Sequence, residues 1–133
     1  MICVPTYISK SKIQGVGLFS VFAINDGQEI WRNNPEVDFV FSQDEIRDIL
    51  PQLNEKMKSI IHKFAYLSIT TDSPDAVWNW DGDSGRMMNH SRQPNTSWDA
   101  KTKTLRANRV INSNEELTSD YREWDMGEHE HYY

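Results

Sequence analysis

The most distinctive stretch of this chain reads Asn89-His90-Ser91-Arg92-Gln93-Pro94-Asn95. Asn and Ser side chains favour hydrogen bonds to nearby backbone groups, and Pro94 fixes the backbone, so the stretch predicts a tight loop. His90 adds a polar ring close to apolar Met87 and Met88. In isolation, such a histidine is better explained as a buried ring that satisfies loop carbonyls. The meaning of this loop therefore depends on the segments before and after it.

Two further segments stand out on either side of the loop. The earlier one, Gly15-Val16-Gly17, ends a turn and leads into apolar residues. Paired glycines let a backbone approach a ligand closely, although alone they more often mark a turn. The later one reads Glu115-Glu116-Leu117-Thr118-Ser119-Asp120-Tyr121. Tyr121 by itself would more often be a core aromatic whose hydroxyl bonds a carbonyl, so order and spacing carry the information.

In this order, the three segments resemble the SET domain family of protein lysine methyltransferases. The family's Gly-x-Gly, Asn-His-Ser-x-x-Pro-Asn and Glu-Glu-Leu-Thr-x-Asp-Tyr motifs match residues 15–17, 89–95 and 115–121. The resemblance runs from about residue 8 to about residue 124. It implies a fold that is mainly β with a small helical insert, the β-clip-like SET-domain fold. Its C-terminal segment threads under the Asn-His-Ser loop in a knot-like arrangement, an exception to the usual rule against threading.

The resemblance also implies a domain organisation and a function. A chain of 133 residues has room for one compact domain. We expect a SET domain over residues 1–124, with the insert at about 43–64, and an acidic, aromatic tail over 125–133. The implied activity is that of a protein-lysine N-methyltransferase which uses S-adenosylmethionine on a basic protein segment, histone-like or ribosomal. The alternative is a catalytically inactive SET-like module that binds a basic protein partner.

Site residues follow from the resemblance, position by position. The implied cofactor-binding residues are Gly15, Val16, Gly17, Asn89 and His90, with His90 acting largely through its backbone and packing. Tyr121 would be catalytic, with its hydroxyl orienting the methyl group and the incoming amine. Tyr66 and Trp98 are candidate walls of the substrate channel beside Tyr121. Trp124 is a candidate to stack on adenine, although simple packing explains it equally well.

The chemistry explains why such a site needs apolar walls. A lysine with an ordinary pKa of about 10.4 is neutral only about once in two thousand at pH 7, so the site must desolvate it and lower its pKa. Since the cofactor already carries a positive leaving group, the protein mainly supplies alignment and oxygen or aromatic groups that face the methyl.

Composition limits the partners and the setting. The net charge of −6 argues against direct nucleic-acid binding and favours a basic partner. Acidic residues crowd the C-terminal stretch, where a solvated face is the simpler explanation. Cys3 is the only cysteine, so we expect no disulfide, no cysteine-based zinc site and no other metal. We expect an intracellular protein, cytoplasmic, nuclear or delivered into a host cell, without a membrane span and possibly a homodimer.

Strand and turn patterns dominate the chain outside its middle. The expected strands are residues 7–8, 17–22, 29–31, 37–41, 65–70, 76–80, 96–98, 104–111 and 116–118. Asn25-Asp26-Gly27 between apolar runs predicts a hairpin. The stretch 79–85 spaces oxygen ligands like the start of a calcium loop, but it lacks the loop's later residues and favours a solvated turn. Likewise Glu128-His129-Glu130-His131 favours a mobile tail over a metal site.

A helical pattern interrupts the strands. Apolar residues recur at three- and four-residue steps at positions 46, 49, 50, 53, 57, 60, 61 and 64, which predicts one helix face packed into the core. Ser42 and Glu45 form a capping-box pattern at its start. Pro51 interrupts the pattern, so we expect two helical pieces, with Pro51 in the first turn of the second.

Overall fold

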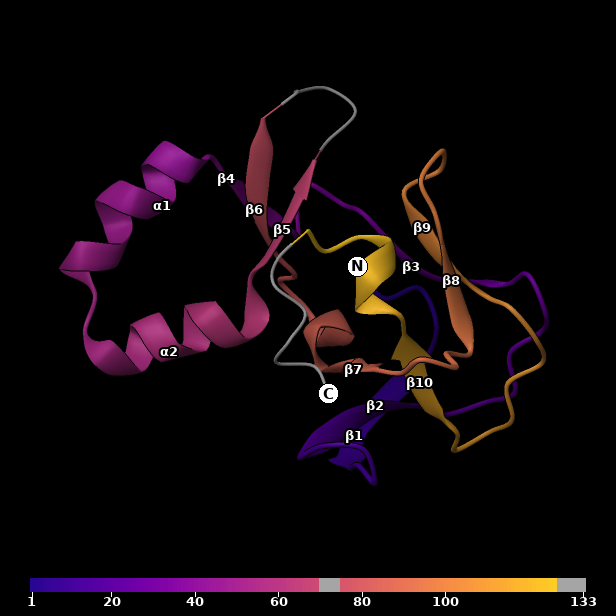
Figure 1. The fold of residues 1–133 in the computed structure, drawn as a ribbon. Helices are drawn as coiled ribbons and strands as arrows, with labels where there is room; N and C mark the ends of the chain where they lie inside the picture. Colours follow the sequence, from indigo (N-terminus) through magenta and orange to yellow (C-terminus); the bar gives the residue numbers. More distant parts are fainter. Residues whose placement is uncertain (70–74, 127–133) are drawn as a thin grey trace.

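The structure is a computed structural model that describes residues 1–69 and 75–126 (Figure 1). Three small sheets form most of it. The first has the order β1-β2-β10-β7, with β1 (Thr6–Lys10), β2 (Val16–Ser20), β10 (Glu116–Ser119) and β7 (Asn89–His90). The second has the order β3-β9-β8, with β3 (Glu29–Arg32), β9 (Thr104–Ala107) and β8 (Thr96–Asp99). The third has the order β4-β6-β5, with β4 (Phe39–Phe41), β6 (Ala76–Trp80) and β5 (Tyr66–Ile69). The expected mainly β fold with a small helical insert is confirmed.

Strand β10 joins parts of the chain that are far apart in sequence. It runs antiparallel to β2, with Leu117 opposite Leu18, and parallel to β7, with Thr118 opposite Asn89. Leu18 and Leu117 are both fully buried, and burying one such side chain contributes about 1.5–3 kcal/mol. The three motifs therefore meet in one sheet, held by the core beneath it.

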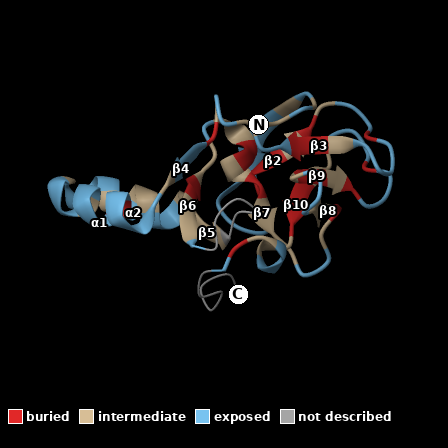
Figure 2. Cartoon of the chain, turned by 90° about the horizontal axis from the view of Figure 1, so that it is seen from above, coloured by how far each residue is buried: buried red, intermediate tan, exposed pale blue. Residues whose placement is uncertain are grey.

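The hydrophobic core links the first sheet to the second. Its buried members are Leu18, Ile24, Ile30, Trp31, Met88, Leu105, Ala107, Ile111 and Leu117. Figure 2 shows the buried residues gathered on β2, β3, β9 and β10, whereas the helices at one end are exposed. Strands β2 and β10, which carry two of the motifs, thus belong to the most firmly packed part of the domain, while β7 at the edge of their sheet is half-buried.

The helical insert spans α1 (Gln43–Ile49), a 3₁₀ turn (Leu50–Gln52) and α2 (Glu55–Phe64). The capping box is confirmed, because the Glu45 N–H donates to Ser42 Oγ at 3.1 Å and the Ser42 N–H donates to Glu45 Oε2 at 2.8 Å. The expected place of Pro51 is wrong. It lies in the separate 3₁₀ turn, because Asn54 begins α2 by accepting the Met57 N–H at 2.9 Å.

The apolar stripe of the insert does not pack into the main core, contrary to the expectation. Ile46 is the one buried residue among its helices, while Ile49 is 36% and Met57 is 40% exposed. Helix α1 contacts β4 and β6 of the small third sheet. The insert projects from the domain (Figure 2), so its stripe has little surface against which to pack.

The expected hairpin at Asn25-Asp26-Gly27 is also wrong. A turn does form there, with the Gln28 N–H donating to Asn25 O at 3.1 Å and Gly27 at a φ of +76°. However, β2 pairs with β1 and β10, whereas β3 pairs with β9. The turn therefore carries the chain from one sheet to another, because the core favours the long-range pairing.

Two expected strands are shorter than their apolar patterns. The strand expected at 17–22 ends at Ser20, whose hydroxyl donates to Asn112 O at 2.8 Å. The strand expected at 104–111 ends at Ala107, because the next residue, Asn108, turns its amide toward Pro94 O at 3.0 Å. Side-chain hydrogen bonds to loops thus end both ladders.

Part of the expected C-terminal tail lies in the described chain. Of the expected tail 125–133, the structure describes Asp125 and Met126, so the prediction for residues 128–131 lies outside the described residues. No helix in the described part of the chain has the length and apolar character needed to cross a bilayer.

Candidate active site

The first part of the site is the turn that contains the Gly-x-Gly motif. Gly15 has a φ of +51°, and its carbonyl accepts the Ser11 N–H at 3.0 Å. Val16 follows with an exposed side chain. The Asn89 amide nitrogen lies 3.0 Å from Val16 O and 3.3 Å from Gln14 O. The asparagine of the second motif therefore fixes the backbone of the first.

Gly17 lies where β2, Asn89 and Glu116 meet. A Cβ atom at Gly17 would lie 2.1 Å from Glu116 Oε1 and 3.1 Å from Asn89 Nδ2. Glu116 in turn accepts the Asn89 amide at 2.8 Å and the Ser11 hydroxyl at 2.9 Å. The absence of a side chain at Gly17 therefore makes room for the contacts that join all three motifs.

Asn95 fixes β10 in place. Its Oδ1 accepts the Thr118 N–H at 2.9 Å, and its Nδ2 donates to Glu116 O at 2.8 Å. The Ser91 N–H also donates to Ser119 O at 3.0 Å. Asn95 is buried, so these bonds replace water for both partners. The Pro-Asn end of the loop thus has a structural role, which leaves Asn89 and His90 as its site residues.

His90 lies under Tyr121. The side chain of His90 is buried, and its Nδ1 accepts the Tyr121 N–H at 3.2 Å. The centres of the two rings are 5.2 Å apart. His90 therefore supports Tyr121 through ring packing and through a hydrogen bond from the Tyr121 backbone to its side chain, while its expected contact with the cofactor stays a prediction.

Tyr121 begins a 3₁₀ turn (Tyr121–Glu123) directly after β10. Asp120 caps this turn by accepting the Arg122 N–H at 3.0 Å. The Tyr121 hydroxyl donates to the Met88 carbonyl at 2.6 Å. Burial, followed by the charges of Asp125 and Asp81, raises the pKa of Tyr121 to about 12. The phenol is therefore neutral at physiological pH, with its proton directed to the Met88 carbonyl.

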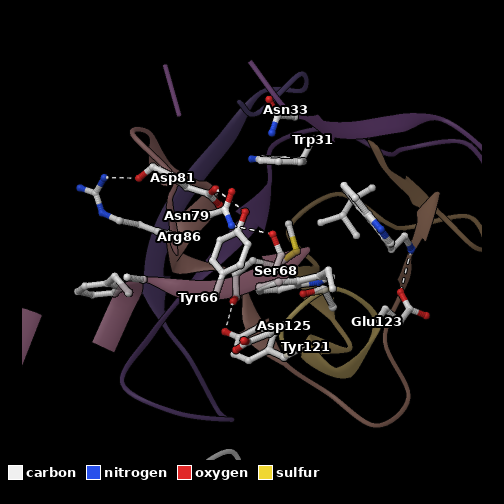
Figure 3. Close-up of a pocket in the computed structure, with 18 of the residues that line it drawn as sticks. Trp31, Asn33, Tyr66, Ser68, Asn79, Asp81, Arg86, Tyr121, Glu123 and Asp125 are labelled. Carbon is white, nitrogen blue, oxygen red and sulfur yellow. Dashed lines mark hydrogen bonds between the residues drawn. The ribbon is translucent and has the colours of Figure 1, made fainter. Parts of the chain in front are cut away.

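A cavity of about 390 Å³ opens beside Tyr121 (Figure 3). Tyr66, Trp98 and Trp124 line it together with Tyr121. The Trp124 ring lies 4.5 Å from the Tyr66 ring and 5.0 Å from the Tyr121 ring, centre to centre. Trp124 therefore packs against its neighbours and also faces the cavity. All the channel residues expected from the sequence meet here.

Further residues line the cavity that the sequence patterns did not single out. Trp31 lies 6.1 Å from Trp98, ring centre to ring centre. Asn33, Lys63 and Met88 also face the space. An apolar residue of the core and one facing a cavity show the same local pattern, so no signal in the sequence distinguished Trp31.

Three carboxylates line the same cavity, Asp81, Glu123 and Asp125. Asp125 accepts the Leu67 N–H of β5 at 3.2 Å, and Glu123 accepts the Trp98 N–H of β8 at 2.8 Å. These two bonds hold the segment after Tyr121 against two sheets. Four basic residues line the same cavity, Lys63, Arg86, Lys103 and Arg122, so its charges are nearly balanced and the aromatic walls are the feature that favours a cationic ligand.

The stretch 79–85 is not the solvated turn that its composition favours. Asn79 and Gly85 are buried. Asp83 accepts the Gly85 N–H at 2.8 Å and the Ile2 N–H at 2.6 Å, which ties the turn to the start of the chain. Asp81 faces the cavity, with the Tyr66 hydroxyl 3.3 Å from its Oδ1. Trp78 and Trp80, on either side of Asn79, were the available sign in the sequence that this stretch is partly buried.

The residues expected at the site thus form two groups joined at one point. Asn89 holds the exposed Gly-x-Gly turn on one side. Tyr66, Trp98 and Trp124 line the cavity on the other. His90 and Tyr121 lie between them, since Asn89 and His90 pair with β10 while Tyr121 faces the cavity. A ligand at the turn and one in the cavity would approach each other at Tyr121.

The sequence of this chain is similar to that of a known protein. A candidate histone-lysine N-methyltransferase 1 of Plasmodium falciparum (isolate 3D7) is 31% identical over 125 residues. That match covers 87% of this chain and 2% of the relative. The chain therefore spans a small part of the length of this relative.

Solved structures share the fold at low sequence identity. A chain of the Chaetomium thermophilum Polycomb Repressive Complex 2, autoinhibited and bound to S-adenosylmethionine, matches with a TM-score of 0.63 and 20% identity over 92% of this chain and 16% of that one. A Neurospora SET domain histone lysine methyltransferase matches with a TM-score of 0.59 and 20% identity over 89% and 52%. A candidate histone methyltransferase of Plasmodium falciparum matches with a TM-score of 0.57 and 19% identity over 90% and 95%.

The family model of the SET domain matches residues 15–122. This range begins at the first glycine of the Gly-x-Gly turn and ends one residue after Tyr121, so it contains all three motifs. The shared fold and the site geometry agree with that match. The chain therefore belongs to the SET domain family.

Proposed function

We propose that this chain is a protein-lysine N-methyltransferase that uses S-adenosylmethionine. The observation that carries the proposal is the position of the Tyr121 hydroxyl. It is fixed by its 2.6 Å bond to Met88 O, at the junction of the Asn89–His90 segment and the aromatic cavity. A neutral, oriented oxygen at such a junction can align a methyl group with an incoming amine.

The residues of the site fit the cofactor. The exposed backbone of the Gly-x-Gly turn, Asn89 and His90 would hold it, with Trp124 against the adenine. The Trp124 Nε1 atom is buried and has no hydrogen-bond partner among the described residues. When bound, S-adenosylmethionine supplies a methyl group activated by a positively charged sulfur. The aromatic rings of the cavity suit that charge.

The cavity also fits the lysine side chain. Tyr66, Trp98 and Tyr121 provide rings that exclude water from the amine. Removing water disfavours the charged ammonium and lowers the lysine pKa, which increases the neutral fraction able to attack. The same three residues would therefore form the walls of the channel and lower the pKa of the lysine.

The substrate that we propose is a lysine in a basic protein segment, histone-like or ribosomal. Support comes from the net charge of −6 and from the aromatic walls of the cavity, which suit a lysine side chain. The name of the Plasmodium relative favours a histone. Such substrates lie in the cytoplasm or nucleus, which is where we propose that the protein acts.

Labelling of a protein mixture tests this proposal. The protein is incubated with a cell lysate, purified core histones and S-adenosylmethionine carrying an isotopically labelled methyl group, and the products are mapped by mass spectrometry. We expect label on lysine of one or a few basic proteins. The modified peptides report target, position and methyl number together.

Two controls complete the labelling experiment. A reaction with S-adenosylhomocysteine added should lose the label, since that product occupies the same site. Asp26→Asn, which removes one exposed acidic charge remote from the cavity lining, should leave it unchanged. Cofactor binding without any label above background would contradict methyl transfer and indicate a SET-like module that binds a basic partner.

A further inference from the structure

A buried acid in the cavity suggests how the lysine loses its proton. Asp81 directly follows β6 and lines the cavity together with Tyr66 and Tyr121 (Figure 3). The Tyr66 hydroxyl lies 3.3 Å from Asp81 Oδ1. Within residues 1–69 and 75–126, this is the hydrogen bond that the Asp81 carboxylate makes. At 3.3 Å it is a long bond, so the carboxylate keeps most of its capacity to accept.

The other two cavity carboxylates are already used. Asp125 accepts a backbone N–H from β5, and Glu123 accepts one from β8. Moving the buried Asp125 would leave a backbone donor unsatisfied, which is costly. Glu123 is exposed and lacks a water-excluding setting. Within the described residues the Asp81 carboxylate makes no backbone bond, so among the three it is the one suited to exchange a proton.

Charged groups from several elements surround Asp81. Asp38, before β4, pairs with the amino group of Met1 at 3.1 Å. Asp83 holds two backbone N–H groups, as described above. Arg86 donates to the main-chain carbonyls of Asp81 and Asp83, at 3.4 and 3.1 Å.

These neighbours and the burial of the carboxylate set its acidity. Burial, followed by the negative charge of Asp38, raises the pKa of Asp81 to about 7, while the Met1 amino group acts in the opposite direction. An unperturbed aspartate has a pKa of about 3.9 and an unperturbed lysine one of about 10.4, so the raised value reduces the mismatch between them. Water-excluding aromatic walls reduce it further by lowering the lysine pKa.

We propose that Asp81 accepts the proton that the substrate ammonium must lose before methyl transfer. An N–H bond of the ammonium breaks, its electron pair stays on nitrogen, and an O–H bond forms on the Asp81 carboxylate. The freed lone pair is the one that methyl transfer consumes. Asp81 then returns the proton to water at the cavity mouth. Tyr66 is a positioning residue in this step, because its hydroxyl orients the carboxylate. The inference rests on the proposed methyltransferase function.

The first test is the pH dependence of kcat/KM for a basic peptide that carries the lysine found by labelling. Asp81 must be deprotonated to accept, so activity should fall as pH decreases through about 7. Asp81→Asn should lower kcat/KM at neutral pH by about 10²-fold or more and remove this acid limb. Its rate should then rise about tenfold per pH unit toward the lysine pKa, since only peptide already neutral can react. Asp26→Asn is the matched control and should keep the wild-type profile.

A change of substrate separates proton removal from a structural role. A peptide with aminoethylcysteine in place of the target lysine has a less basic amine and needs less help to lose its proton. It should recover a large part of the Asp81→Asn defect, and equal losses with both peptides would overturn the inference. Tyr66→Phe should show a smaller loss and keep the acid limb.

A measurement on the wild-type protein keeps the inference testable even if Asp81→Asn does not fold. Carbon-13 NMR of labelled aspartate should show a carboxyl that titrates near pH 7. Titration of every carboxyl near the ordinary aspartate range would overturn the inference. If Asp81→Asn transferred methyl groups with the wild-type pH profile, the role of Asp81 would be refuted but the proposed function would stand. If the wild-type protein transferred no methyl group, both the proposed function and this inference would be refuted.

Discussion

Tyr121→Phe is expected to lower kcat for methyl transfer by about 10²- to 10³-fold, comparable to the loss of one oriented polar group in an active site. The substitution removes only the hydroxyl group, which donates a hydrogen bond to Met88 O at 2.6 Å. The ring remains, and it packs on His90 and Trp124. Affinity for S-adenosylmethionine should therefore change little, because the fold and the Gly-x-Gly turn are preserved. Steady-state kinetics with the basic peptide identified by labelling measures kcat. Calorimetric titration with S-adenosylmethionine measures the affinity for the cofactor.

The control for this variant is Tyr7→Phe. Tyr7 also loses a hydroxyl that makes a hydrogen bond, to Asn114 Oδ1 at 3.1 Å, and it also stacks on another ring, that of Phe19. It lies on β1, outside the cavity lining. We expect Tyr7→Phe to retain wild-type kinetics. A wild-type rate in Tyr121→Phe would show that Tyr121 is not catalytic.

Gly17→Ala is expected to have the largest effect on the cofactor side. The added methyl would lie 2.1 Å from Glu116 Oε1, so Glu116 must move and give up its bonds to Asn89 and Ser11. Overpacking of this kind typically costs about 1–3 kcal/mol of unfolding free energy. Because the Asn89 amide then loses its fixed position on the turn, affinity for S-adenosylmethionine should fall by about tenfold or more. Thermal unfolding and calorimetric titration measure the two changes.

Gly27→Ala controls for the loss of a glycine as such. Gly27 has a φ of +76° and no atom within 4 Å of an added Cβ, so the substitution introduces backbone strain without a clash. A cost of about 1 kcal/mol in stability is expected, with cofactor affinity unchanged. Wild-type cofactor affinity in Gly17→Ala would contradict the role assigned to the contact between the three motifs.

The central part of the fold could be predicted because its motif residues specify their own long-range contacts. Asn95 bonds a backbone N–H and a backbone carbonyl of β10, and Gly17 leaves room for Glu116 and Asn89. The residues that form the recognisable motifs in the sequence are the same residues that make the long-range contacts in the structure. The pairing of β10 with β7 follows from them.

The insert could be predicted only in part. The period of its apolar residues identified the helices, and Ser42 identified where they begin. Periodicity shows which face of a helix is apolar, but not what that face meets. Here it meets a three-stranded sheet instead of the core, so Ile46 is buried while Met57 stays exposed.

Asp81 illustrates what local patterns do not contain. Turn-forming residues look alike whether they face water or a cavity. The environment of Asp81 depends on Tyr66 from β5 and on Asp38 from before β4, neither of which is near it in sequence. The raised pKa of Asp81 is thus a product of tertiary structure, and local sequence does not indicate it.

Titration of the wild-type protein with S-adenosylmethionine in a calorimeter tests the central claim most directly. We predict saturable binding at one site per chain, displaced by S-adenosylhomocysteine. The same binding should stabilise the folded protein by about 2.7 kcal/mol at a ligand concentration of one hundred times Kd, which raises Tm. Absence of binding heat together with an unchanged Tm would contradict the assignment of residues 15–17, Asn89 and His90 to the cofactor, and with it the proposed methyltransferase.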